Sequence, residues 1–200
     1  MSILLLGGSP AAVSSTGRLL DHVAEKLAER STGHRYTKVQ VRELPAHALL
    51  HAETSDLAIK RALAAVSEAD AVIIATPVYK ASYTGLLKAF LDLLPQDGLA
   101  GKLVLPLATG GSQSHMLALD YALRPVLSSL NPKHVLPSIY ATEAQVTWSE
   151  ENGLVLDAPI EARVNEGVEQ LSASLQALHK VAPEQFREIP FSQLQYSVSY

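Results

Sequence analysis

Short apolar runs alternate along this chain with longer segments of helical periodicity. Three of the runs are almost entirely apolar: Ser2–Leu6, Ala71–Ala75 and Lys102–Ala108. Strands without polar alternation are buried on both faces, which is typical of a parallel sheet covered by helices. Further strands are predicted at Tyr36–Leu44 and His134–Ala141. Helices are predicted at Thr16–Arg30, Leu57–Ser67, Gly85–Leu94, Gln113–Leu130 and Ile160–His179. With right-handed crossovers, this order predicts an α/β fold, a doubly wound five-stranded parallel sheet in a three-layer α/β/α sandwich.

The length of 200 residues suits one domain with a modest extension. We expect residues 1–182 to form that single domain. Within it, Gln145–Pro159 is predicted to be a small hairpin insertion that turns at Asn152-Gly153. Residues 183–200 are polar with scattered aromatic side chains. They are predicted to be a C-terminal tail, either loose or packed on a partner.

Composition excludes several classes of function. The chain has no cysteine, so disulfides and thiolate chemistry are excluded. The net charge of -4 comes without a basic run that would bind nucleic acid or a membrane surface. No apolar run reaches membrane-spanning length, and no charged leader precedes the first apolar run. The seven histidines lack metal-ligand spacing. We therefore expect a soluble cytoplasmic protein without a metal site.

Ligands of doubly wound sheets bind beyond the carboxyl ends of the strands, which here are followed by three loops. In the first loop, hydroxyl side chains gather where a helix begins, and the free N–H groups and dipole of a helix start favour an anion. These residues are Ser9, Ser14, Ser15 and Thr16. The cluster suits a terminal phosphate, although simple capping of the helix would also explain it. The glycine patterns of dinucleotide sites and P-loops are absent, which favours a mononucleotide.

The second and third loops offer backbone groups rather than reactive side chains. Pro77, Val78, Tyr79 and Lys80 form the second loop, in which proline restricts the chain and Tyr79 supplies an aromatic wall. The third loop consists of Thr109, Gly110, Gly111 and Ser112, and its glycines allow close approach of a ligand to the backbone. A phosphate grip beside two such loops favours flavin mononucleotide (FMN), a cofactor that would carry the chemistry itself.

Four stretches resemble the NADPH-dependent FMN reductases of bacterial alkanesulfonate assimilation, which belong to the flavodoxin-like reductase superfamily. The resemblance extends to about Tyr140 and rests on "GSP…SST…LL", "ATPVYKASYTGLLKAFLDLLP", "LAGKLVLPLATGG" and "LALDYALRPVLSSL". It implies a flavodoxin-like fold and hydride transfer from NADPH to FMN. It also implies a partner, an alkanesulfonate monooxygenase that depends on the reduced flavin. The chain departs from many relatives at Ala11, where they carry arginine.

The resemblance also implies roles for the loop residues. The FMN phosphate would be held by Ser9, Ser14 and Thr16, with Ser15 as a neighbour. The isoalloxazine would lie against residues 77–80, and its pyrimidine side would face residues 109–112. Hydride would pass directly from the nicotinamide to the flavin, so no catalytic side-chain acid or base is required.

The predicted helix Gln113–Leu130 contains Pro125 in its interior. Proline cannot donate a hydrogen bond to the carbonyl of Tyr121, so the helix must widen or kink there. Either a π-bulge or a plain proline kink with Tyr121 in the core would satisfy this constraint. The resemblance favours the first, because it implies an inserted tyrosine, a π-helix at a subunit interface and a role for Tyr121 in flavin transfer. It also implies a homo-oligomer, specifically a dimer of dimers.

Two other functions are compatible with the residues. One is a flavodoxin-type electron carrier, although such carriers are usually strongly acidic. The other is an FMN-bound quinone or azo reductase. The sequence does not distinguish NADPH from NADH, because no arginine is evidently placed for a 2′-phosphate.

Overall fold

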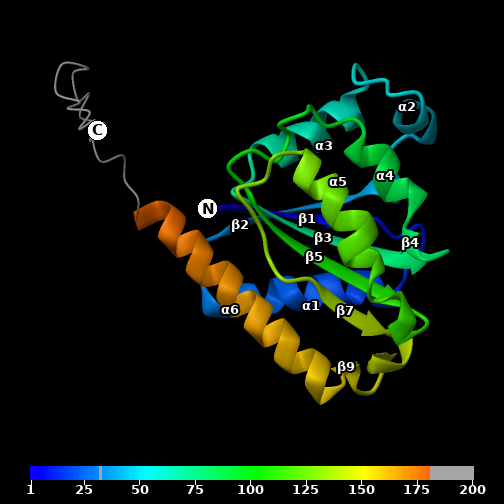
Figure 1. The fold of residues 1–200 in the computed structure, drawn as a ribbon, viewed down its shortest axis with the longest axis vertical. Coiled ribbons are helices and arrows are strands. Elements are labelled where there is room, and N and C mark those ends of the chain that lie inside the picture. The colour runs from blue at the N-terminus through cyan, green and yellow to red at the C-terminus, as the bar shows by residue number, and fades with distance from the viewer. Residues whose placement is uncertain (32, 181–200) are drawn as a thin grey trace, which may run out of the picture.

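The computed structural model describes residues 1–31 and 33–180. Its main sheet has the order β2-β1-β3-β5-β6, and β7 continues the edge position of β6 (Figure 1). Neighbouring strands in this order are parallel. The strands are β1 (Ser2–Gly7), β2 (Arg35–Gln40), β3 (Ala71–Tyr79), β5 (Leu103–Gly110), β6 (His134–Val135) and β7 (Ile139–Thr142). The predicted doubly wound parallel sheet is confirmed, and its strand order is that of flavodoxin-like folds.

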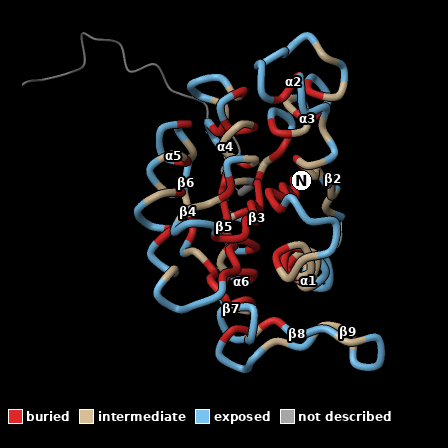
Figure 2. The backbone as a smooth tube through the Cα atoms, turned by 90° about the vertical axis from the view of Figure 1, so that its right-hand side faces the viewer, coloured by how far each residue is buried: buried red, intermediate tan, exposed pale blue. Residues whose placement is uncertain are grey.

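Helices cover both faces of the sheet, which confirms the three-layer sandwich (Figure 1). On one face lie α1 (Ser15–Arg30) and α6 (Ala158–Lys180). The other face is covered by α2 (Ala46–Leu50), α3 (Leu57–Ser67), α4 (Gly85–Leu91) and α5 (Arg124–Ser129). Each face has its own apolar core cluster, and Figure 2 shows buried backbone concentrated in the central strands.

Burial explains why the apolar runs form strands. In β3, every residue from Ala71 to Val78 is buried, as expected for a central strand covered on both faces. The helical stripe of α1 is equally clear, because Leu19, Leu20, Val23 and Leu27 are each fully buried against the sheet. Packing of these two patterns against each other stabilises one layer of the sandwich.

Two of the predicted strands are shorter or more divided in the structure than predicted. Strand β2 ends at Gln40 instead of Leu44, because its partner β1 ends at Gly7, opposite Gln40. The chain then forms a 3₁₀ turn, η1 (Val41–Glu43). The predicted strand His134–Ala141 is split into β6 and β7, and Pro137, which has no N–H to donate, lies in the gap. The local sequence pattern therefore predicted that strands form here. The partner strand determined where β2 ends, and a proline lies where the edge strand is divided.

The predicted helix Gln113–Leu130 is divided into three pieces. A 3₁₀ turn, η2 (Gln113–His115), is followed by a π-helix, η3 (Leu119–Leu123), and then by α5. The Arg124 amide donates to the carbonyl of Leu119, five residues back, which is the bond that defines a π-turn. The predicted π-bulge is confirmed. The alternative of a kink with a buried Tyr121 is wrong, because Tyr121 is 78% exposed.

A hairpin forms within the predicted range Gln145–Pro159, with its turn at residues 150–152. It consists of β8 (Val146–Ser149) and β9 (Gly153–Leu156), preceded by a 3₁₀ turn, η4 (Glu143–Gln145). Gly153 has a φ of 65°, a value that favours glycine in the turn. Leu154 and Leu156 pack on the core between the sheet and α6. The tail predicted at 183–200 lies outside the described residues. Within residues 1–31 and 33–180, no helix has the length and apolar character needed to cross a membrane.

Candidate functional site

The three loops selected from the sequence meet at the carboxyl ends of the parallel strands. Gly7 of β1 lies beside Ala75 of β3, and Pro77 of β3 lies beside Thr109 of β5. The Gly8 amide then donates to the carbonyl of Ala75 at 2.7 Å, which holds the first loop against the second. Parallel strands thus deliver segments far apart in sequence to the same place.

The first loop ends at the start of α1, where Ser14 is the N-cap. Its hydroxyl accepts a hydrogen bond from the Gly17 amide at 3.0 Å, and the first turn carries no acidic residue. Ser15 is the first residue of the helix and is half-buried. The buried hydroxyl of Ser9 accepts from the Ala11 amide at 3.2 Å. The helix dipole at this point favours an anion, and no carboxylate in the first turn opposes it.

Thr16 and Thr109 join the first loop to the third. Both side chains are buried, and their hydroxyls form a short hydrogen bond to each other. The hydroxyl of Thr16 therefore lies beneath the loop, unlike that of Ser14, which caps the helix. Thr109 likewise contributes to the support of the site through its side chain.

The second loop is a tight hairpin that prolongs β3. β3 continues to Tyr79, beyond the predicted end at Ala75, and pairs antiparallel with β4 (Ser82–Tyr83). Its two turn residues, Lys80 and Ala81, have φ values of 50° and 62°. Such values at both central positions fit the hairpin twist but strain residues that carry a side chain. Pro77 and Val78 are buried beneath the turn, while Tyr79 is 52% exposed at its tip.

Thr84 connects these loops and was missed by sequence reasoning. Its buried hydroxyl donates to the Gly8 carbonyl at 2.7 Å and accepts from the Leu87 amide at 3.2 Å, so it also caps α4. Its amide donates to the hydroxyl of Thr76 at 3.1 Å. Threonine followed by glycine before an apolar helix is a capping signal that could have identified the residue.

The third loop is shaped by Tyr140, another residue that sequence reasoning missed. Its hydroxyl donates to the carbonyl of Ser112 at 2.6 Å. A Cβ added at Gly110 would lie 2.4 Å from that hydroxyl, so glycine is required there, whereas a Cβ at Gly111 would meet nothing. The Ser112 hydroxyl accepts from the Ser114 amide at 3.2 Å. Gly111 and Ser112 are exposed.

A cation lies beside the first loop although the loop itself has none. The guanidinium of Arg18, on α1, stacks 4.3 Å above the ring of Trp148 from β8. They border a cavity of about 300 Å³ that also reaches Ser14 and Lys38. Lys38 is paired with Asp21, whereas none of the ion pairs among the described residues involves Arg18. The position of Arg18 places a positive charge beside the first loop, where residue 11 is alanine.

The site lacks a group poised for acid–base catalysis. Burial raises the pKa of both Tyr83 and Tyr140, so these hydroxyls stay neutral at neutral pH. Among residues 1–31 and 33–180, no group of three or more His, Asp or Glu side chains could hold a metal ion. The arrangement can bind and orient a ligand, but it offers little chemistry of its own.

The described residues fit a flat mononucleotide such as FMN. An uncontested helix N-terminus and adjacent hydroxyls suit a phosphate, and the open space at Gly111 allows a ring to approach the backbone. The Nδ1 atom of His115, just after the third loop, is buried with no hydrogen-bond partner in the described part of the chain. The open space at Gly111, the exposed ring of Tyr79 and the unpartnered Nδ1 atom of His115 are features that a bound heterocycle could contact.

Comparison with known proteins supports the same conclusion. The sequence profile described as NADPH-dependent FMN reductase matches residues 1–147. An FMN reductase (NADPH) of Pseudomonas putida is 43% identical over 176 residues, 88% of this chain and 88% of the relative. The FMN reductase (NADPH) of Escherichia coli K12 is 43% identical over 146 residues, 73% of this chain and 75% of the relative. SfnF of Pseudomonas putida, an NADH-dependent FMN reductase, is 34% identical over 87% of this chain and 92% of its own length.

Solved structures agree with the sequence relatives. The apo form of an NADH:FMN oxidoreductase (EMOB) superposes with a TM-score of 0.79 and 41% identity, covering 86% of this chain and 89% of that chain. An oxidoreductase of Corynebacterium diphtheriae superposes with a TM-score of 0.72 and 30% identity, covering 88% and 95%. The resemblance seen in the four sequence stretches is thereby confirmed. This chain belongs to the NADPH-dependent FMN reductase family, enzymes whose ligands are FMN and a nicotinamide nucleotide.

Proposed function

We propose that the three loops hold FMN while it accepts hydride from NADPH. The observation that carries the proposal is the meeting of a helix N-terminus, a strained aromatic hairpin and a glycine-containing loop at one sheet edge. The phosphate would lie at the start of α1 against Ser9, Ser14 and Ser15, supported from beneath by Thr16. The ring would lie between residues 77–80 and residues 109–112.

When bound, FMN supplies the hydride-accepting chemistry, and the chain supplies binding and orientation. Tyr79 would form a wall against the ring, since its exposed side chain stands at the tip of a rigid hairpin. The backbone amides of Gly111 and Ser112, which are exposed, would donate hydrogen bonds to the pyrimidine side, where negative charge would develop on reduction. Tyr140 keeps that backbone in place through its bond to the Ser112 carbonyl.

We further propose that the enzyme releases reduced FMN to a monooxygenase of an alkanesulfonate-type system and works as a homo-oligomer, a dimer of dimers. Support for the oligomer comes from exposed apolar side chains on and before the π-helix. Met116 is 41% exposed, Leu117 53% and Tyr121 78%. A contiguous set of exposed apolar side chains is typical of an interaction surface. Support for a sulfonate-type partner comes from the π-helix and from the resemblance of the four sequence stretches to the reductases of alkanesulfonate assimilation.

The test uses flavin-stripped protein, with oxidation of NADPH and NADH followed after addition of FMN, FAD or riboflavin. We expect multiple turnovers with FMN and a clear preference for FMN over riboflavin, because riboflavin lacks the phosphate. Equal rates with all three flavins would contradict the phosphate site. A single turnover with flavin retained on the protein would instead indicate an electron carrier.

A further inference from the structure

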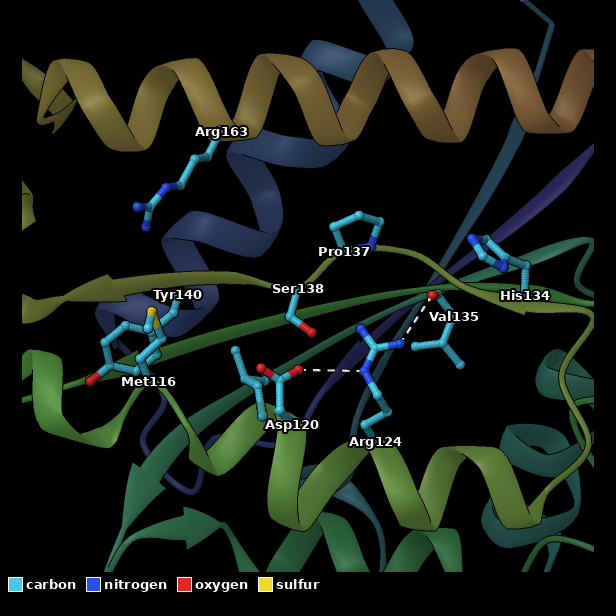
Figure 3. Close-up of a pocket in the computed structure, with 10 residues that line it drawn as sticks. Met116, Asp120, Arg124, His134, Val135, Pro137, Ser138, Tyr140 and Arg163 are labelled. Carbon is cyan, nitrogen blue, oxygen red and sulfur yellow. Dashed lines mark hydrogen bonds and ion pairs between the residues drawn. The ribbon is translucent and has the colours of Figure 1, made fainter.

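A second hollow, of about 460 Å³, lies along the free edge of the sheet between the π-helix and α6 (Figure 3). Its volume falls in the range of small-molecule binding sites, roughly 300–1,000 Å³. It is lined by Met116, Leu119, Asp120, Arg124, His134, Val135, Pro137, Ser138, Tyr140 and Arg163. None of these residues belongs to the three loops proposed to hold FMN.

The hollow exists because the edge strand is interrupted. Val135 pairs with Val104, and pairing resumes only where Ile139 meets Leu107. Residues 136–138 therefore oppose only residues 105 and 106, which places one extra residue on the edge strand, as in a bulge. Each segment contains a proline, Pro106 or Pro137, which has no N–H to donate. Regular hydrogen bonding between the two strands is therefore interrupted there.

Arg124 stabilises the interrupted edge. Its guanidinium donates to the carbonyls of Val135 and Leu136 at 3.3 and 3.2 Å, and its Nε atom lies 3.4 Å from a carboxylate oxygen of Asp120. These contacts compensate the charge of Asp120 and satisfy carbonyls that the sheet leaves free. Arg124 is thus largely engaged by the protein.

Arg163 and Ser138 are the groups left for a ligand. Arg163 extends from α6 toward the hollow, on the side opposite Asp120 and Arg124 (Figure 3). Arg163 is an exposed residue, and none of the ion pairs among residues 1–31 and 33–180 engages its guanidinium. The Oγ atom of Ser138 is buried in the gap between β6 and β7 and also has no partner among those residues. A buried hydroxyl without a partner calls for a water or a ligand.

We propose that this hollow binds a small organic oxyanion, a carboxylate or a phosphate monoester, with its anionic group at Arg163 and a second polar group at Ser138, whose hydroxyl points toward the Asp120 side of the hollow (Figure 3). Two guanidinium groups face the hollow against the single carboxylate of Asp120, which Arg124 already neutralises. Glu166 borders the adjoining smaller hollow and accepts a hydrogen bond from Gln170. Among the residues that line this hollow itself, Arg163 is the cation left without a counter-charge and favours an anion. The apolar walls at Met116, Leu119, Val135 and Pro137 suit a short carbon skeleton.

The position of this site connects it to the rest of the enzyme. Asp120 belongs to the π-helix, and Tyr140, at the other end of the hollow, donates to the third-loop carbonyl of Ser112. The side chain of Tyr140 separates the hollow from Gly110. An occupant would therefore contact the π-helix and the support of the third loop without entering the proposed flavin site.

Titration calorimetry at constant ionic strength tests the proposal, with inorganic phosphate, succinate, citrate and glycerol 3-phosphate as probes. We expect saturable binding of at least one probe to the full chain. Arg163→Gln should weaken that binding by roughly tenfold or more, the equivalent of one charge-assisted hydrogen bond. Ser138→Ala should weaken it by a smaller factor. Both variants should keep the wild-type melting temperature and the wild-type ratio of FMN to riboflavin turnover.

Arg61→Gln is the matched control, because Arg61 is an exposed arginine on α3, away from the hollow, and its loss changes the net charge equally. Equal weakening by Arg61→Gln and Arg163→Gln would overturn the proposal, because it would indicate non-specific attraction. Absence of saturable binding by every probe would also overturn it. So would a change of oligomeric state in Arg163→Gln without anion binding, since the hollow would then be a contact between subunits.

Discussion

At the scale of single residues, Ser14 has two roles that can be separated. Its hydroxyl oxygen accepts from the Gly17 amide and so caps α1, while its proton remains available to a phosphate. Asp56 performs the capping role alone at the start of α3, where its carboxylate accepts from the amides of Ala58 and Ile59. The two caps therefore form a natural pair for comparison.

Ser14→Ala should weaken the binding of FMN far more than the binding of riboflavin. Loss of a hydrogen bond to a charged phosphate costs roughly 1.5–3 kcal/mol, or about ten- to a hundredfold in FMN affinity. Loss of the cap should reduce the free energy of unfolding by about 1 kcal/mol. Fluorescence titration with both flavins measures the first effect and urea unfolding the second. Asp56→Ala should show a similar loss of stability with unchanged flavin affinities. An unaltered preference for FMN in Ser14→Ala would show that the phosphate binds elsewhere.

Tyr79→Ala should impair flavin use without destabilising the fold. The side chain is 52% exposed at the hairpin tip, so its removal leaves no core cavity. We expect a melting temperature within about 2 °C of wild type, since exposed substitutions usually change stability by less than ~0.5 kcal/mol. The value of kcat/KM for FMN should fall at least roughly tenfold, the size of one lost aromatic contact. A large drop in melting temperature with normal kinetics would mean that Tyr79 is structural.

At the scale of elements, the π-helix places Tyr121 on the outside. Pro125 cannot donate to the Tyr121 carbonyl, and the extra residue in the turn absorbs that loss by an Arg124 to Leu119 bond. A π-turn costs stability relative to an α-turn. Its persistence with an exposed aromatic ring therefore fits a surface that another subunit covers.

Deletion of Tyr121 should restore an α-helical register and change the assembly. We expect a smaller oligomer in sedimentation velocity and loss of turnover with free FMN, because the exposed ring and the widened turn are both removed. Tyr121→Ala is the control, since it keeps the chain length and hence the π-turn. It should retain part of the turnover. A deletion variant with the wild-type oligomer and wild-type FMN turnover would rule out this role for the π-helix.

An ionic cluster around Glu161 joins α6 to α1. Its carboxylate contacts Lys26 at 2.7 Å and His22 at 3.0 Å. Burial raises the pKa of Glu161, but hydrogen bonds from Lys26 and His22 outweigh it and leave the pKa below its usual range. A carboxylate whose pKa is lowered by folding stabilises the protein above its unfolded-state pKa. That contribution is lost as the pH falls through the folded-state pKa.

Glu161→Gln should therefore destabilise the protein at pH 7 by about 1 kcal/mol, and the difference from wild type should shrink as the pH falls below about 4. Urea unfolding across this pH range measures both effects. Glu169→Gln, also on α6, is the control, because Glu169 is 71% exposed and lies 3.8 Å from Arg30. A Glu161→Gln effect that does not vary with pH would mean that packing, not ionisation, is responsible.

At the scale of the whole molecule, several exposed apolar side chains lie near the loops that follow the strands. Val13, Tyr79, Tyr121 and Trp148 belong to the first loop, the second loop, the π-helix and the hairpin, and each is at least 47% exposed. Leu117, just before the π-helix, is 53% exposed. The two core clusters, by contrast, are closed under helices on both faces of the sheet. Ligand contacts and subunit contacts are therefore both expected near the carboxyl ends of the strands.

Saturation with FMN should raise the melting temperature of the whole domain. A ligand at about a hundred times its Kd adds roughly 2.7 kcal/mol to stability, which corresponds to about 5–10 °C for a domain of this size. Riboflavin at the same concentration should give a smaller shift, because it lacks the phosphate. Differential scanning calorimetry measures both shifts. Equal shifts for the two flavins would indicate that the phosphate contributes nothing to binding.

Sequence alone was sufficient for features that depend on local pattern. Continuous apolar runs predicted the central strands, Asn152-Gly153 predicted the hairpin turn, and Pro125 predicted the widened helical turn. Each follows from side-chain periodicity or from the backbone restrictions of a single residue. The three loops could be selected in the same way, since strand ends carry the ligands of such sheets.

Tertiary structure decided the features that depend on partners distant in sequence. Thr84 meets Gly8 and Thr16 meets Thr109, pairs separated by 76 and 93 residues, so no local pattern indicates them. Strand β2 stops at Gln40 because β1 ends opposite it, and the edge strand is interrupted at residues 136–138, beside residues 105 and 106 of β5. Hydrogen bonds and strand ends of this kind need both partners in place, and only the folded chain brings the two together.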